Sequence, residues 1–150
     1  MPKHSETRKL PYTADQMFDL VAEVERYPEF LPWTAAARVA SREQTPEGEI
    51  VIADLVVSFQ VFREKFKSRV LLHPGRDQID TSYLDGPFKY LNSIWRFRDL
   101  AQDGVEVHFE VDFEFRNPIL GAAAQMFFTA AMQQIVRAFE SQAAKQYGTA

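Results

Sequence analysis

The alternation of apolar and polar residues is clearest in Val105–Phe115, where the two kinds follow each other strictly. The odd positions carry Val or Phe, and the even positions carry Glu, His or Asp. Successive side chains of a strand point to opposite faces, so this pattern predicts a strand with one buried and one wet side. Asn117 and Pro118 follow, a capping side chain and a residue favoured at the first helical position. They predict one long helix over about 119–147.

Further strands are predicted where apolar-rich runs are separated by turn residues. These runs cover about residues 3–9, 36–44, 50–59, 63–73, 78–84 and 89–100. A helix is predicted between the first two of these strands, because Met17, Phe18 and Val21 recur there at helical spacing. Pro28 ends this helix. Strands that succeed one another without intervening helices pair antiparallel. We therefore expect a single α+β domain over residues 1–150, with helices packed on one face of an antiparallel sheet.

Composition narrows the classes of function. The formal net charge of -4 does not favour a general nucleic-acid binder, which needs a basic field, so nucleic acid is an unexpected partner. The absence of cysteine excludes disulfides, thiolate nucleophiles and cysteine-based metal sites. The first residues lack the apolar core of a secretory signal, and no run reaches the ~20 apolar residues of a membrane span. We expect a cytoplasmic protein that touches membranes only at their surface.

No catalytic constellation is evident. The three histidines lie on different predicted strands, and the sequence has no phosphate-binding glycine loop, nucleophile elbow or HExxH motif. We expect no enzyme activity and no metal or covalent cofactor. One basic strip, Arg63, Lys65, Lys67 and Arg69, shares a single strand face. We interpret this strip as the solvated face of a sheet. The alternative is that it binds phosphates or anionic headgroups.

The apolar faces predict a cavity. The chain has 13 Phe, and the inner side of the sheet would present Val57, Phe59, Trp95, Phe97, Phe109, Val111, Phe113 and Phe115. The second half of the long helix is amphipathic, but residues 119–132 are apolar nearly all round. Such a helix must be buried against the sheet on one side and against a ligand, partner or membrane on the other.

Three segments carry a resemblance to a known family. They are Tyr27-Pro-Glu-Phe-Leu-Pro-Trp33, Leu84-Asp-Gly-Pro-Phe-Lys-Tyr-Leu-Asn-Ser-Ile-Trp-Arg-Phe97 and Phe113-Glu-Phe-Arg-Asn-Pro118. Over almost its whole length the chain resembles the bacterial relatives of the coenzyme Q-binding protein, in the START-like, polyketide-cyclase-like superfamily, whose bacterial branch includes the ribosome-association toxin. The resemblance implies the helix-grip (START / Bet v 1-like) fold, a curved seven-stranded antiparallel sheet around a long C-terminal helix, with an apolar tunnel. Thr34 and Ser58 replace the cysteine and glycine more usual in the family.

The resemblance implies a carrier or chaperone for ubiquinone (coenzyme Q) or a similar polyisoprenoid lipid, in support of respiratory electron transport and quinone biosynthesis. Its expected partners are the lipid, the inner face of the cytoplasmic membrane, touched transiently, and respiratory or quinone-biosynthesis enzymes. The residues expected to line the tunnel are Tyr27, Phe30, Leu31, Trp33, Val57, Phe59, Phe88, Leu91, Trp95, Phe97, Phe109, Val111, Phe113, Met126, Phe127 and Ala130.

Two alternatives remain open. A ribosome-association toxin that blocks subunit joining would be favoured by a basic face, which the net charge of -4 does not supply. A cyclase or aromatase would need acid or base groups that point into the tunnel. Asp54 and Ser58 are the weak candidates for such groups.

Overall fold

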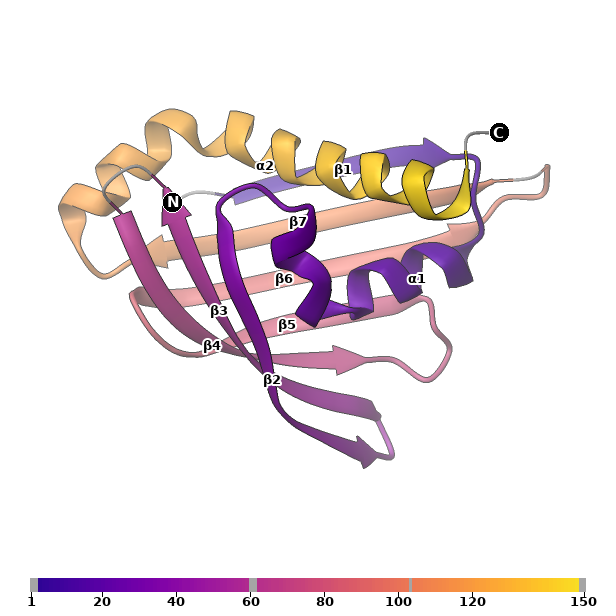
Figure 1. Cartoon of the computed structure of the whole chain (residues 1–150), viewed down its shortest axis with the longest axis horizontal. Helices are drawn as coiled ribbons and strands as arrows, with labels where there is room; N and C mark the ends of the chain where they lie inside the picture. Colours follow the sequence, from indigo (N-terminus) through magenta and orange to yellow (C-terminus); the bar gives the residue numbers. More distant parts are fainter. Residues whose placement is uncertain (1–2, 60–61, 103, 149–150) are drawn as a thin grey trace.

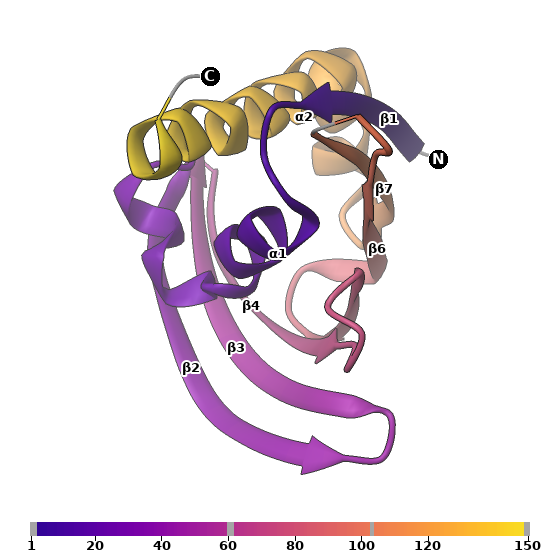
Figure 2. The ribbon, with the colours of Figure 1, turned by 90° about the vertical axis from the view of Figure 1, so that its right-hand side faces the viewer.

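The fold is a curved antiparallel sheet that holds a short and a long helix on its concave side (Figures 1 and 2). The computed structural model describes residues 3–59, 62–102 and 104–148, with the side chains of 59, 62, 120 and 123–128 left out. The elements, in chain order, are β1 (Lys3–Leu10), α1 (Ala14–Ala22), the 3-10 helix η1 (Val24–Glu29), β2 (Thr34–Thr45), β3 (Gly48–Phe59), β4 (Phe62–Leu72), β5 (Gln78–Asp85), β6 (Phe88–Asp99), β7 (Val105–Phe115) and α2 (Pro118–Tyr147).

The seven strands form one sheet in the order β1-β7-β6-β5-β4-β3-β2, and all the pairs are antiparallel. Five of the six neighbouring pairs therefore join strands that are consecutive in the sequence, and β1 closes the far edge by pairing with β7. This architecture confirms the α+β helix-grip fold expected from the sequence. Figure 2 shows the sheet curving around α1, with α2 lying across the top of the opening.

Irregular pairing helps the sheet to curve. The register shifts at two places between β2 and β3, once between β4 and β5 next to Ser68, and once between β6 and β7. Such bulges bend a strand and increase its twist, which hollows the inner face. Gly86, in the turn after β5, has φ +143, and a Cβ there would lie 2.6 Å from Phe66 Cβ. Only glycine therefore allows this turn to approach β4 so closely.

The core is built by the faces that the alternation predicts. In β7 every odd residue from Val105 to Phe113 is buried, whereas the even residues are half-buried and face outward. On that outer face Arg98 Nη2 lies 3.0 Å from Glu106 Oε2, across the β6–β7 hairpin. Such cross-strand pairs of opposite charge help to fix the register.

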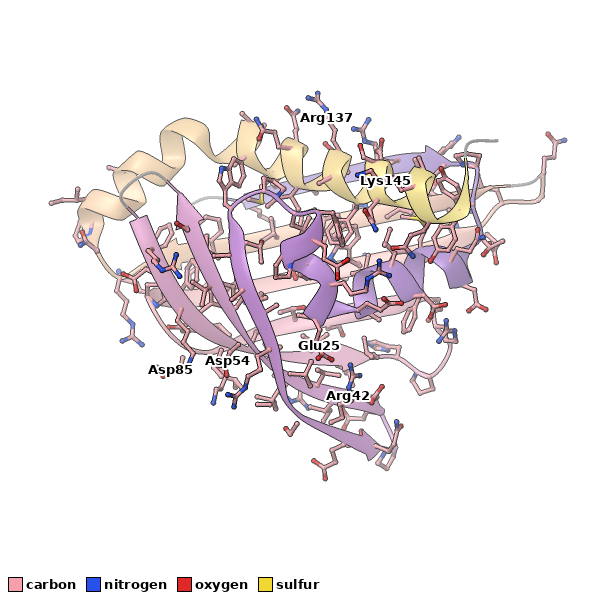
Figure 3. All side chains as sticks on the ribbon, viewed as in Figure 1. Glu25, Arg42, Asp54, Asp85, Arg137 and Lys145 are labelled. Atoms are coloured by element: carbon pink, nitrogen blue, oxygen red, sulfur yellow. The ribbon has the colours of Figure 1, made fainter. Side chains whose placement is uncertain are left out.

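Both helices turn an apolar stripe toward the sheet. In α1, Thr13 and Gln16 form a reciprocal capping box, which satisfies free N–H groups of the first turn, and the helix then buries Met17 and Leu20. In the second half of α2, Val136, Phe139 and Ala143 are buried, as the amphipathic pattern predicts. Arg137 projects from the outer side of α2 in Figure 3.

Candidate functional site, an apolar cavity beneath α2

A cavity of about 310 Å³ lies between the concave face of the sheet and α2. Side chains from β3 to β7, from the segment that joins η1 to β2, and from α2 form its described walls, and most of them are aromatic or aliphatic. The volume is at the lower end of the ~300–1,000 Å³ range of small-molecule sites. This finding confirms that the structure has the apolar cavity predicted between the last helix and the sheet.

Most of the residues expected to line the cavity are brought together there. The structure places Tyr27, Leu31, Trp33, Val57, Phe88, Leu91, Trp95, Phe109, Val111 and Phe113 on its walls. From α2 the described wall residues are Ala131, Met132, Ile135 and Phe139. The side chains of Phe59, Met126 and Phe127, which belong to the same prediction, lie outside the part of the chain that the structure describes.

Three of the expected lining residues lie elsewhere. Phe30 packs against Phe139, with ring centroids 5.4 Å apart, and is not among the residues that line the cavity. Phe97 is buried against Phe18 of α1, with ring centroids 6.1 Å apart, so it belongs to the core. Ala130 is exposed because it lies nine residues before Phe139, which at 3.6 residues per turn is the opposite side of the helix.

The inner wall of the cavity is an aromatic cluster around Trp95, which is 6% exposed. Its ring lies 4.4 Å from that of Phe109 on β7 and 5.0 Å from that of Phe139 on α2, the latter edge to face. Aromatic pairs in such arrangements are favourable beyond their burial. A flat ligand entering the cavity would therefore meet a preformed aromatic surface.

The outer end of the cavity is a lip formed by residues 31–33. Tyr27, just before the lip, donates its phenolic hydrogen to the Val21 carbonyl, and burial raises the pKa of the Tyr27 hydroxyl. Trp33 has φ +62, a left-handed backbone conformation that is uncommon for a bulky residue. A hydrogen bond of 2.8 Å from the Ser58 amide to the Trp33 carbonyl helps to hold this conformation.

A set of polar residues in the cavity is absent from the sequence prediction. Glu64 and Ser68 on β4, Thr81 on β5 and Ser93 on β6 all line the cavity. The alternation in β4 contains the information, because the basic strip occupies the odd positions, and Glu64 and Ser68 share the even positions of the opposite face with Phe66 and Val70.

The polar groups named as candidates for a cyclase do not face the cavity. Asp54 pairs in register with Arg38 of β2 and Lys67 of β4, on the outer face of the sheet, and Figure 3 shows it on that side. Ser58 has the same parity on β3 and is not among the cavity residues. The expectation that these two residues point inward is therefore wrong, since the inner positions of β3 are the odd ones.

The basic strip lies on the outer, convex face of the sheet, as its interpretation as a solvated face requires. Arg63 and Lys65 are exposed, while Lys67 and Arg69 are half-buried. Lys67 stands opposite Asp54 on one side and Asp85 on the other. In the part of the chain that the structure describes, Arg63, Lys65 and Arg69 form no ion pair within 4.0 Å.

The described residues contain neither a candidate metal site nor a helix suited to span a membrane. No group of three or more His, Cys, Asp or Glu side chains is arranged to hold a metal ion there. Within the same residues, none of the helices combines the length and the apolar character needed to cross a membrane.

Comparison with known proteins adds the following findings. Residues 10–140 match a family described as "Polyketide cyclase / dehydrase and lipid transport". A ribosome association toxin of Rickettsia prowazekii is 38% identical over 140 residues, which cover 91% of this chain and 92% of that protein. A mitochondrial coenzyme Q-binding protein homolog of Xenopus laevis is 32% identical over 150 residues, which cover 97% of this chain and 59% of that protein.

Among solved structures, an 18 kDa protein from Caulobacter crescentus is 37% identical. The two structures align with a TM-score of 0.81 over 99% of this chain and 100% of the other. The curated relatives named above are described as a toxin and as a binding protein, and neither description is that of an enzyme.

Proposed function

This chain belongs to the polyketide cyclase / dehydrase and lipid transport family, and from that premise we propose that it binds ubiquinone or a similar polyisoprenoid lipid and carries it without changing it chemically. The observation on which this proposal rests is the apolar cavity of about 310 Å³ beneath α2. Burial of isoprenoid carbons contributes ~0.8 kcal/mol per CH₂, so such walls hold a tail that water rejects. A cavity of this size admits a ring and a short stretch of tail, and a longer tail must leave past the lip.

The lining of the cavity supports a carrier more than an enzyme. Among the described lining residues, Tyr27 and Glu64 are the ionisable ones. The Tyr27 hydroxyl is already used by the Val21 carbonyl. Cyclisation or dehydration needs a positioned acid and a positioned base, and one carboxylate at the outer end of the cavity does not provide both.

Mass spectrometry of the organic extract tests this proposal directly. The protein, purified from its native host under gentle conditions, should carry a quinone or polyisoprenoid at near-stoichiometric amounts. A matched preparation with Leu91→Asp, which puts a charge on the cavity wall, should carry much less, because an unpaired buried charge excludes an apolar ligand. An extract without any such lipid, from protein that is otherwise folded, would contradict the proposal.

Delivery of so insoluble a ligand requires contact with a bilayer, so we extend the proposal to a transient stay at the inner face of the cytoplasmic membrane. Quinone-biosynthesis or respiratory enzymes would then receive or supply the lipid there. The protein has a net charge of -4. Contact with anionic lipid is therefore weak and mainly apolar.

A second candidate function is association with the ribosome, in keeping with the name of the Rickettsia relative. The observation that favours it is the row of cations on the convex face, of which Arg63, Lys65 and Arg69 lack ion-pair partners among the described residues. Sucrose-gradient profiles with added protein should show fewer joined ribosomes, and Arg63→Glu with Lys65→Glu should abolish that effect. Lys3→Glu with Lys9→Glu on β1 is the matched control. Unchanged profiles with the parent protein would rule this function out.

A further inference from the structure

Three hydroxyl groups form a polar patch on the otherwise apolar floor of the cavity. Thr81 and Ser93 face each other directly across the β5–β6 pair. Thr81 is also opposite Val70, and Ser68 lies two residues before Val70 on β4, so Ser68 is the diagonal neighbour of Thr81. Direct neighbours of this kind have Cβ atoms ~4.5–5.5 Å apart and diagonal ones ~7–8 Å. Their hydroxyls are therefore close enough to contact one small polar group.

The patch lies deep in the molecule. Ser68 is opposite Ala53 in register, which is four residues along β3 from Val57 beside the lip. At ~3.3 Å per residue this separation is about 13 Å. Ser68 is only 1% exposed, and Ser93 is two residues from Trp95 of the aromatic wall.

The hydroxyls are not used by the protein itself. In the described part of the chain, the side chains of Ser68, Thr81 and Ser93 make no hydrogen bond to another protein group. A buried hydroxyl without a partner destabilises a fold, and an alanine or valine of similar shape would not. Ser68 is buried, Thr81 and Ser93 are half-buried, and all three line the cavity, so a polar group of a ligand in the cavity is the partner that their hydroxyls can take.

We propose that the hydroxyl patch of Ser68, Thr81 and Ser93 is a head-group site, which takes the polar end of the lipid inward and leaves its tail directed to the lip. This inference rests on the proposed function and specifies its ligand. Hydroxyls both donate and accept, so the patch fits a flat ring with carbonyl, methoxy or hydroxyl oxygens. The Trp95 and Phe109 rings beside it supply the apolar surface for the ring face.

The orientation can be read from the two tryptophans, since Trp33 stands at the lip and Trp95 beside the patch. A quinone ring quenches the fluorescence of an indole close to it. With decylubiquinone as the probe, the Trp33→Phe protein, which retains Trp95, should be quenched strongly. The Trp95→Phe protein, which retains Trp33, should be quenched weakly. The reverse order would place the head at the lip and overturn the inference.

The patch itself is tested by Ser68→Ala, Thr81→Val and Ser93→Ala. Each change should weaken decylubiquinone binding about two- to tenfold, as expected for the loss of one hydrogen bond. Ser82→Ala is the matched control, because Ser82 lies on the outer face of β5 opposite Arg69 and Asn92 and should bind as the parent does.

A readout without ligand separates a binding role from a structural one. The ligand-free Ser68→Ala protein should melt at the same temperature as the parent or higher, because a buried hydroxyl without a partner is removed. A lower melting temperature, or unchanged binding in all three variants, would overturn the head-group site. If the parent protein itself fails to bind decylubiquinone, the proposed function fails, and the head-group site fails with it. Binding by the parent with reversed quenching refutes the head-group site alone.

Discussion

At the scale of single residues, Tyr27 connects the lip to the core. Its hydroxyl is bonded to Val21, and its ring meets Phe139 edge to face at 5.5 Å. Burial of the phenol disfavours its charged form and raises its pKa above the ordinary value of about 10. A residue on the cavity wall is thus also a stabilising contact between η1 and α2.

Tyr27→Phe should reduce the free energy of unfolding by about 1 kcal/mol at pH 7, the usual net value of one hydrogen bond. Above pH ~10 the unfolded parent releases the Tyr27 proton while the folded parent keeps it, so the stability of the parent falls with rising pH. The variant lacks this loss, so the difference in unfolding free energy between the two proteins should shrink above pH 10. Urea denaturation at pH 7, 9 and 10.5 measures it. A difference that stays constant over this range would contradict the assignment.

At the scale of elements, Arg76 joins the β4–β5 turn to α1. Its Nε lies 2.5 Å from Asp15 Oδ1, its Nη2 bonds the Asp19 carboxylate, and its guanidinium lies over the Phe18 ring at 4.7 Å from the ring centroid. The fork of one guanidinium therefore holds two turns of α1 against the end of the sheet. This contact keeps α1 in the position that buries Phe97 beneath it.

Arg76→Ala should cost about 1 kcal/mol of unfolding free energy, since both ion pairs are largely exposed and the cation–π contact adds a similar small amount. Arg76→Lys keeps the charge but loses the fork and the planar stacking, so it should recover less than half of the loss. Arg76 has φ +57, and Ala and Lys are strained equally there, so the comparison isolates the side chain. Urea denaturation of the parent and of both variants, in low salt and in 1 M NaCl, measures the loss of unfolding free energy for each substitution and its dependence on salt. A loss that does not shrink in high salt would argue against the ion pairs.

At the scale of the whole molecule, the start of α2 lies at the end of the sheet where β7 finishes (Figure 1). Ile119 in its first turn is 79% exposed, and Ala122, Thr129 and Ala130 are also exposed. The sequence predicts that one side of this half of α2 is covered by a ligand, a partner or a membrane, and these exposed residues are the ones that such a surface would cover. An exposed isoleucine at the start of the helix that covers the cavity is the kind of side chain that a bilayer would bury.

If the protein exchanges its lipid at a membrane, Ile119→Ser should slow the transfer of decylubiquinone between vesicles several-fold. The melting temperature should stay nearly unchanged, because a side chain this exposed contributes little to folding. Ile119→Leu, which keeps the apolar surface, is the control and should transfer at the parent rate. Equal transfer rates for Ile119→Ser and the parent would show that this turn does not touch the bilayer.

The amino-acid sequence by itself determined the element order, the antiparallel pairing and most of the cavity wall. This was possible because the two-residue period of a strand fixes which side chains share a face, and β7 shows that period without interruption. The same period also predicts that Glu64 and Ser68 lie on the inner face of β4. A prediction based on apolar residues alone does not include them.

Only the tertiary structure decided what covers each face and how deeply. Phe97 has the same parity as Trp95, yet α1 covers one and the cavity opens beside the other. Ala130 and Ala131 are neighbours in an apolar run, and the rotation of α2 about its axis, set by the packing of Phe139, turns Ala131 alone to the cavity. A local periodicity predicts only the direction in which each side chain points from the axis of its own helix or strand. Depth, cover and helix rotation depend on contacts between elements far apart in the chain, which no local pattern contains.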